Sequence, residues 1–374
     1  MSGLDSSNGQ RYNQCGLSKY WCITMPGRLV NSTVPGGGYG IKSGTSMSAP
    51  HATGALALVM ERFPYMTNEQ ALQVLLTTAT QLDGSITQAP TNSVGWGVAN
   101  LERAMRGPGQ LLGTFDANLG AGLTDVWSNN ISDQALIQRQ AEDSAEQATW
   151  QQTLISRGWQ NGVASTASQQ DQADYATGTA RAAAAAQRQY QGSLIKSGAG
   201  RLILEGANTY RGDTLVNGGL LSVNGSLVSD VQVNAGGTLG GNGQIGGLTA
   251  RNGGIVAPGN SIGTLQVNGN VTLEPGSTYA VELSPTASDR IVATGSATVV
   301  RREHDAGAGE CNACGLEFCS DPKRGRSPVQ RVASGQWHQW PVWQRVLQLR
   351  LPRWPTRLRS QRGRTERRAN CRFQ

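Results

Sequence analysis

Several features are absent from this sequence of 374 residues. It has no apolar run of about 18 residues, so nothing in it predicts a transmembrane helix. Its first residues, MSGLDSSNGQ, lack the charged and apolar regions of a secretory signal. These absences indicate either a cytoplasmic protein or a fragment whose true start lies upstream. Cys15 and Cys22 lie in a loop-like stretch and could close a small disulfide ring, which favours the fragment, although two free thiols are the alternative.

Charge is also scarce, at 15% of residues, and it is unevenly placed. Residues 1–300 hold 16 Lys and Arg against 19 Asp and Glu, whereas residues 301–374 hold 16 against 6. The net charge of +7 therefore comes from the last segment alone. Residues 1–300 are therefore not basic, and their composition does not predict a nucleic-acid partner.

Residue usage shifts three times and predicts four segments: 1–107, 108–191, 192–300 and 301–374. In the first, Met47 to Phe63 is apolar on most sides, which predicts a helix buried within a large domain. Thr67 followed by Gln70 predicts the capped start of a second helix. The second segment reads as a helical connector, with one helix from Ser132 and Asp133 to about Ser156 and another from Thr179 to Tyr190.

The third segment has 22 Gly in 109 residues and no Cys or Trp. Short alternating runs such as VQV and TLQV are bounded by Gly and Asn turns about every 8–12 residues. That spacing permits a sandwich or a stacked solenoid, and the similarity of successive runs favours a parallel β-helix with Gly at tight corners. The scattered Asp213, Asp230 and Asp289 predict solvated turns rather than a calcium array.

The fourth segment has 15 Arg to one Lys and contains no Ile, Tyr or Met. Such usage is what GC-rich DNA yields when read out of frame, so we expect a frameshift near codon 300 and a disordered tail. Cys311, Cys314 and Cys319 could be half of a zinc site, but a second close pair is missing. Interleaved Arg and Trp could instead bind RNA through phosphate contacts and stacking.

The sharpest local signal is the run from Gly44 to His51, GTSMSAPH, which leads a glycine-containing loop into the first predicted helix. A serine at a helix N-terminus lies where free N–H groups and the helix dipole favour developing negative charge. Ser46 could therefore be a nucleophile whose reaction passes through an oxyanion, or it could simply cap the helix.

GTSMSAPH followed by ATGALAL resembles the active-site serine motif of subtilisin-like serine proteases. The resemblance implies that Ser46 is the nucleophile and that its N–H is one oxyanion donor, within a motif completed by Gly44, Thr45, Met47, Ser48, Ala49, Pro50 and a structural His51. In this family the triad Asp and His precede the serine. Residues 1–45 contain no His and only Asp5 as a carboxylate, so the resemblance implies that the triad partners and the oxyanion-hole Asn lie upstream and that this chain alone is inactive. His304 and His338 lie after the serine and do not fit that order.

Other segments resemble the proteases of this family that are passengers of bacterial autotransporters. They are Asn13 to Gly16, Trp21-Cys22, Pro26-Gly27, Gly95-Trp96-Gly97 and, as a passenger-associated transport repeat, residues 192–227. The resemblance implies an α/β catalytic part, a right-handed β-helix and a Cys15–Cys22 disulfide. It also implies polypeptide substrates, an outer-membrane translocator β-barrel as partner, and a location at the cell surface or outside the cell. No cofactor is expected, and calcium, known in the family, has no recognisable site here. The alternative is a structural or adhesive passenger without catalysis.

Overall fold

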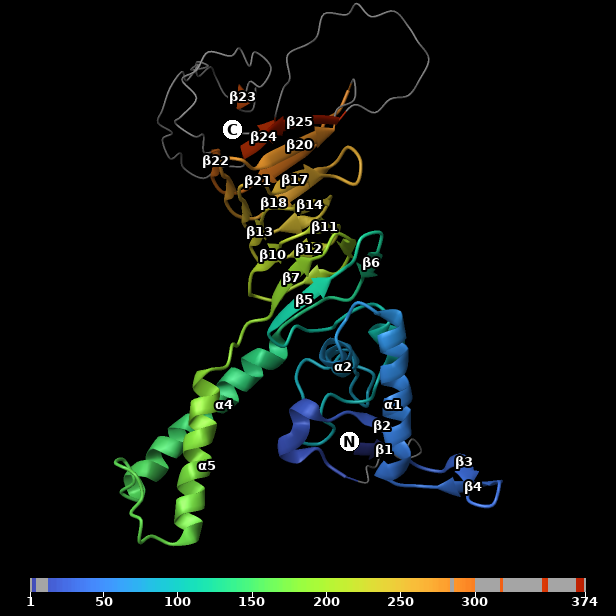
Figure 1. Ribbon diagram of the computed structural model, residues 1–374, viewed down its shortest axis with the longest axis vertical. Coiled ribbons are helices and arrows are strands. Elements are labelled where there is room, and N and C mark those ends of the chain that lie inside the picture. The colour runs from blue at the N-terminus through green and yellow to red at the C-terminus, as the bar shows by residue number, and fades with distance from the viewer. Residues whose placement is uncertain are drawn as a thin grey trace, which may run out of the picture. The chain divides into compact units, whose positions relative to one another are not determined.

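The computed structural model describes residues 2–4, 13–282, 286–299, 317–318, 345–348 and 368–372 (Figure 1). The chain forms two compact units. The first comprises Met1–Phe115 and Ser132–Ser193, and the second comprises Asp116–Ile131 and Leu194–Gln374. Of the helices in the described ranges, none is long and apolar enough to cross a bilayer.

In the first unit, helices pack on a short parallel strand pair. Strand β1 (Ser2–Leu4) pairs with β2 (Thr24–Pro26), and an antiparallel hairpin follows, formed by β3 (Val30–Val34) and β4 (Gly38–Lys42). Helix α1 (Thr45–Arg62) contacts β2, α2 (Asn68–Thr77) and the short α3 (Leu101–Ala104). Val59, Phe63, Val74 and Trp96 are fully buried in this core.

Helix α1 forms where the sequence predicts it, but it is buried along one face only. Its buried residues are Ser48, Ala52, Ala55 and Val59, which recur every three to four positions and so form one stripe. Leu58 and Met60 are exposed. The expectation of burial on most sides is therefore not met among the described residues, because β1, β2, α2 and α3 together cover only that stripe.

The predicted cap of helix α2 is confirmed. The Thr67 hydroxyl accepts a hydrogen bond from the Gln70 N–H at 3.2 Å, and the Gln70 side chain accepts one from the Thr67 N–H at 2.9 Å. This reciprocal pair is the capping box that the Thr-x-x-Gln pattern indicates.

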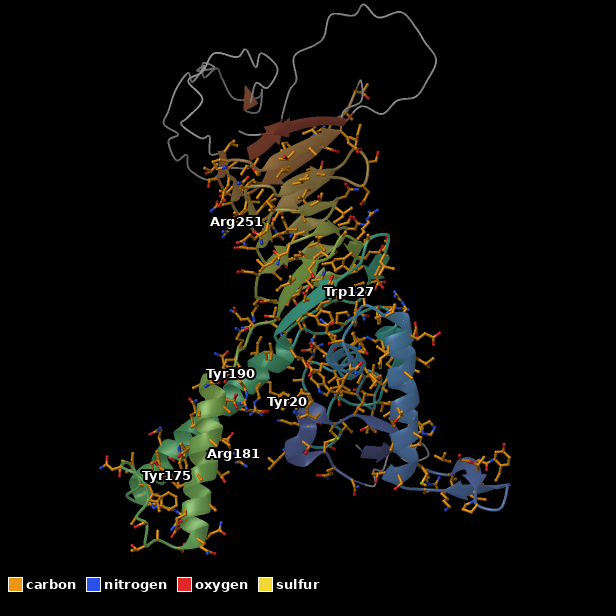
Figure 2. All side chains as sticks on the ribbon, in the orientation of Figure 1. Tyr20, Trp127, Tyr175, Arg181, Tyr190 and Arg251 are labelled. Atoms are coloured by element: carbon orange, nitrogen blue, oxygen red, sulfur yellow. A yellow bond between two sulfur atoms is a disulfide. The ribbon has the colours of Figure 1, made fainter. Side chains whose placement is uncertain are left out.

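Helices α4 (Gln134–Ser156) and α5 (Gln169–Ala186) form a hairpin. The first agrees with its predicted range, but the second begins ten residues before the predicted start at Thr179. Its true start is set by Ser168, whose side chain accepts from the Asp171 N–H at 3.1 Å. Near the far end of the hairpin, Trp150 and Trp159 both contact the ring of Tyr175, which Figure 2 labels.

The second unit is a stack of short parallel strands on three faces, so the β-helix prediction is confirmed. The first face consists of β5 (Thr114–Asn118), β7 (Ser193–Ser197), β10 (Thr214–Val216), β13 (Val231–Val233), β16 (Leu248–Ala250), β19 (Val271–Leu273) and β22 (Ala297–Val299). The second consists of β6 (Thr124–Trp127), β8 (Arg201–Leu204), β11 (Gly219–Val223), β14 (Gly237–Gly241), β17 (Ile255–Pro258) and β20 (Thr278–Glu282). The third consists of β9 (Ala207–Asn208), β12 (Ser226–Leu227), β15 (Gln244–Ile245), β18 (Thr264–Val267) and β21 (Arg290–Ala293).

Apolar side chains, four aliphatic and one aromatic in the row described next, stack in register inside this unit. On the second face Leu202, Leu221, Leu239, Val256 and Tyr279 occupy successive rungs at one position, and all are buried. The corners are tight, as the glycine pattern predicts. At Gly241, whose φ is +102°, an added Cβ would lie 2.1 Å from the Val223 carbonyl oxygen.

Two features of this unit differ from the sequence-based expectations. Strands β5 and β6 come from residues 114–127, within the range expected to be a helical connector. Asp289 is not a solvated turn residue, because its side chain is buried and accepts hydrogen bonds from the N–H groups of Gly263 and Glu282, both at 2.8 Å. These bonds join a loop to the following rung, which is a role that charge spacing alone does not reveal.

The segment expected to be disordered, residues 301–374, lies mostly outside the described residues. The described parts are three short strands: β23 (Glu317–Phe318), β24 (Arg345–Gln348) and β25 (Arg368–Arg372). They pair antiparallel, β25 with β20, β24 with β21, and β23 with β24. The possible zinc ligands Cys311, Cys314 and Cys319, and most of the Arg and Trp of the possible RNA-binding segment, lie outside the described residues.

Candidate active site

Ser46 is the second residue of helix α1, directly after the β3–β4 hairpin. The turn between them is fixed by two hydrogen bonds: the Gly44 N–H donates to the Gly27 carbonyl at 2.7 Å, and the Leu29 N–H donates to the Ser43 side-chain hydroxyl at 2.9 Å. Gly44 is the N-cap residue of α1. Its φ is 143°, a backbone conformation that residues with a side chain rarely adopt. The hairpin therefore delivers the chain to the start of α1 in one defined conformation.

The side chain of Ser46 is exposed. The N–H groups of the first helical turn have no acceptor within the helix, and the helix dipole adds partial positive charge at this end. An oxyanion formed at Ser46 would thus meet a backbone N–H and a favourable field. This arrangement suits a nucleophile for acyl transfer.

The rest of the motif holds this helical turn in place. Ser48 is fully buried, and its hydroxyl donates to the Met25 carbonyl at 3.2 Å, which attaches α1 to β2. Pro50 lies inside the helix and has no N–H, so the carbonyl of Ser46 receives no bond from the residue four positions on. Thr45 and Met47 are half-buried, and Ala49 is exposed.

His51 does not face Ser46 as a base. Its Nδ1 lies 2.8 Å from the carbonyl oxygen of Met47 on its own helix, and its side chain is exposed. A position five residues after Ser46 places it around the helix from the serine. Asp5, His304 and His338 lie outside the described residues. In the described part of the chain, no group of three or more His, Cys, Asp or Glu could hold a metal ion.

Cys15 and Cys22 form a disulfide, with their Cα atoms 5.8 Å apart. It closes a ring around the 3-10 helix η1 (Gly16–Trp21). Trp96 anchors this ring. Its backbone N–H donates to the carbonyl oxygen of Cys22 and its indole Nε1–H donates to the carbonyl oxygen of Tyr20, both at 2.9 Å. The structure thus joins the Cys pair to the Gly95-Trp96-Gly97 segment, which the sequence places more than 70 residues away.

Sequence reasoning misses a polar network on the other side of this ring. Lys19 forms an ion pair with Glu142 of α4, and the Tyr20 hydroxyl donates to the same carboxylate at 3.0 Å. Burial alone would raise the pKa of Glu142, but hydrogen bonds from Lys19, Gln138 and Tyr20 lower it below its usual value. No sequence pattern links Lys19 and Tyr20 to Glu142, because over 120 positions separate them.

Comparison with known proteins agrees with this geometry. The model of the subtilase family matches residues 4–97. This part of the chain is therefore similar to part of a subtilase. It contains the disulfide ring, the β3–β4 hairpin, Ser46 and Trp96. The model of the passenger-associated transport repeat matches residues 194–223, at the start of the β-helix.

Individual relatives extend over both units. The chain is 34% identical over 307 residues to an extracellular serine protease of Serratia marcescens, covering 75% of this chain and 27% of the relative. It is 28% identical over 245 residues to the Neisserial autotransporter lipoprotein NalP of Neisseria meningitidis serogroup B, covering 65% of this chain and 17% of that protein. Subtilisin E of Bacillus subtilis is 40% identical over 83 residues, which are 22% of either chain. The chain thus spans about a quarter, or less, of these relatives' length.

Proposed function

We propose that this chain is the nucleophile-bearing part of a serine endopeptidase displayed by an autotransporter. The observation that carries the proposal is the exposed Ser46 at the N-terminus of α1, within a segment that matches the subtilase family. The names of the relatives, which include extracellular serine proteases and an autotransporter, support it.

In the proposed reaction, Ser46 Oγ attacks the carbonyl carbon of a peptide bond while a His takes its proton. The tetrahedral oxyanion is held by the Ser46 N–H and by an Asn side chain. The intermediate then collapses to an acyl-enzyme and releases the amine, which takes the proton from the His. Water hydrolyses the ester in the second half of the cycle, with the His again acting as base and the Asp orienting it.

The His, the Asp and the Asn are proposed to come from parts of the protein outside this chain. The motif order of subtilases places them before the serine, and residues 1–45 contain no His and only one carboxylate, Asp5. Residues 1–374 alone are therefore expected to be inactive, because residues 1–45 supply no His that could serve as the base.

A fluorophosphonate probe tests both parts of this proposal. We expect no labelling of residues 1–374, and Ser46-dependent labelling of a longer chain that includes subtilase motifs with the His and the Asp. Ser46→Ala in the longer chain is the control and should abolish labelling. Labelling of residues 1–374 at Ser46 would contradict the proposed need for outside residues. A longer chain that carries both motifs and is not labelled would favour a structural or adhesive passenger instead.

The proposed substrates are polypeptides, met outside the cell or at its surface. The proposed partner is an outer-membrane translocator β-barrel, which the passenger-associated transport repeat and the autotransporter relative support. We propose no calcium site and no other cofactor in this chain.

A further inference from the structure

The disulfide ring contacts two different parts of the first unit. On one side its backbone is held by the loop before Trp96, through Gly16 N–H to Asn92 O at 2.7 Å and Trp96 N–H to Cys22 O at 2.9 Å. On the other side the side chains of Lys19 and Tyr20 reach Glu142 of α4. The eight residues between and including the cysteines thus contact both the subtilase core and the α4–α5 hairpin.

One face of helix α4 makes this contact. Gln138, Arg139, Glu142 and Asp143 lie on neighbouring turns, as positions three to four apart do. Gln138 donates to the Pro90 carbonyl at 3.0 Å and to Glu142 at 2.7 Å, and the Arg139 guanidinium lies 5.1 Å from the centre of the Tyr20 ring. Apart from Glu142, which lies on α4 itself, these partners belong to the ring or to the loop just before the segment that holds the ring.

The same face of α4 also binds residues that follow helix α5. Asp143 is buried and forms ion pairs with Arg139 at 2.8 Å and Arg188 at 2.6 Å, and the Tyr190 hydroxyl donates to it at 2.8 Å. Tyr20 and Tyr190, both labelled in Figure 2, stand at the two ends of this network. Docking of α4 on the ring is therefore coupled to the position of the chain that leaves α5.

Farther along α4, the hairpin is held together by contacts between its own two helices. Beyond Asp143, side chains of α4 contact α5: Glu146 pairs with Arg181 at 3.2 Å, and Trp150 lies against the ring of Tyr175. Toward its start, α4 is tied to the core by the Gln110 side chain, which accepts from the Ala135 N–H at 2.9 Å. The ring contact lies between this tie and the outer hairpin.

We propose that the Cys15–Cys22 ring is an oxidation-dependent latch that docks the α4–α5 hairpin on the subtilase core. With the disulfide closed, Lys19 and Tyr20 are presented together to Glu142. When the disulfide is reduced to two thiols, the short ring opens. The side chains of Lys19 and Tyr20 then no longer point together toward Glu142, and α4 pivots about its first turn.

The redox step is thiol–disulfide exchange with a second disulfide. One cysteine thiolate attacks that disulfide and forms a mixed disulfide, and the other cysteine then displaces the partner. The S–S bond of the partner breaks and the Cys15–Cys22 bond forms. Two electrons and two protons pass to the partner, which leaves as a dithiol. Opening of the ring by a dithiol reductant is the reverse of this reaction.

The latch makes a reciprocal prediction. If ring closure favours docking by some factor, docking must favour ring closure by the same factor, because the two equilibria share one thermodynamic cycle. Removing the Glu142 contact should therefore make the disulfide easier to reduce, although Glu142 lies on a different element from both cysteines.

The experiment uses residues 1–374 with the four cysteines after residue 300 replaced by Ser, so that one pair remains. The Cys15–Cys22 equilibrium is measured in dithiothreitol redox buffers for this chain, for Glu142→Gln and for Glu146→Gln. Glu146 is the matched control, because it is a glutamate one turn farther along α4 that pairs with Arg181 inside the hairpin. We expect Glu142→Gln to shift the equilibrium toward the dithiol by about tenfold and Glu146→Gln to leave it unchanged.

Hydrogen exchange supplies the second readout. In the Cys15→Ala/Cys22→Ala chain we expect amides of α4 after Gln138 to lose protection while those of α1 and α2 keep it. Unchanged protection of α4, or an unshifted redox equilibrium in Glu142→Gln, would overturn the latch. A loss of protection throughout α1 and α2 would also overturn it, because the disulfide would then stabilise the whole subtilase core rather than the hairpin contact.

Discussion

The buried hydroxyl of Ser48 donates a hydrogen bond to the carbonyl oxygen of Met25, at 3.2 Å. Ser48 lies two residues after Ser46, so this bond fixes the first turn of α1, and with it the nucleophile, to strand β2. Ser46 itself is exposed and makes a poor anchor. The position of the candidate nucleophile thus depends on its buried neighbour.

Ser48→Ala should therefore destabilise the first unit by about 1–2 kcal/mol, since it leaves the Met25 carbonyl with one partner fewer in a buried site. Urea denaturation followed by tryptophan fluorescence measures this free energy of unfolding. Thr53→Ala is the control, because Thr53 is exposed and bonds only to the Ala49 carbonyl of its own helix. Equal effects of the two substitutions would show that the Met25 bond does not stabilise the turn.

Gly95→Ala should strongly destabilise the seat of the disulfide ring. An added Cβ would lie 2.1 Å from the Cys22 carbonyl oxygen, and φ at Gly95 is +62°. Gly84→Ala separates the two causes, because Gly84 has a φ of +81° but no atom within 4 Å of the added Cβ. We expect about 1 kcal/mol from Gly84→Ala, for the backbone conformation alone, and several-fold more from Gly95→Ala. Thermal unfolding of both variants provides the comparison.

Because of Lys196, we expect an unusual pH dependence of the stability of the β-helix. Its side chain is buried in β7 and its Nζ donates to the carbonyls of Ser197, Gly198 and Gly218 at 2.7–3.0 Å. Burial lowers the pKa of this lysine to about 8, which Asp116 only partly opposes. Between about pH 8 and 10.5 the unfolded chain keeps the proton that the folded chain has lost, so the free energy of unfolding should rise with pH across this window.

Lys196→Met is the reference for this prediction, because it removes the titrating group and the three donated hydrogen bonds. We expect the variant to lack the rise between pH 8 and 10.5. Denaturant titrations of both proteins across that window give the slope. A parallel pH dependence of the two would show that Lys196 is not its source.

Asp289→Ala should destabilise the last described rungs by about 2 kcal/mol or more, because it leaves the Gly263 and Glu282 N–H groups without this buried carboxylate acceptor. Asp213→Ala should change stability by less than about 0.5 kcal/mol, since Asp213 is exposed. Hydrogen exchange of residues 263 and 282 locates the effect. If both variants behave alike, the buried carboxylate is not a structural tie.

Local patterns were enough to predict several elements correctly. The capping box at Thr67 and Gln70, the extent of α4 and the short strands of the β-helix follow from propensity, capping and alternation, which act over a few residues. The sequence predicts too late a start for helix α5, because Gln169 to Gly178 is polar and has no apolar stripe. The cap formed by Ser168 and Asp171, visible in the sequence, was the signal that could have corrected its start.

The sequence by itself determined the candidate nucleophile, because a motif from Gly44 to His51 is contiguous and its chemistry depends on one helix N-terminus. It also determined the parallel stacking, since each rung repeats the same short pattern. Only the tertiary structure decided which face of α1 is buried, that Asp289 ties two rungs, and that the disulfide ring meets Glu142. These contacts join residues from 7 to 123 positions apart, and they arise from packing, for which no local pattern codes.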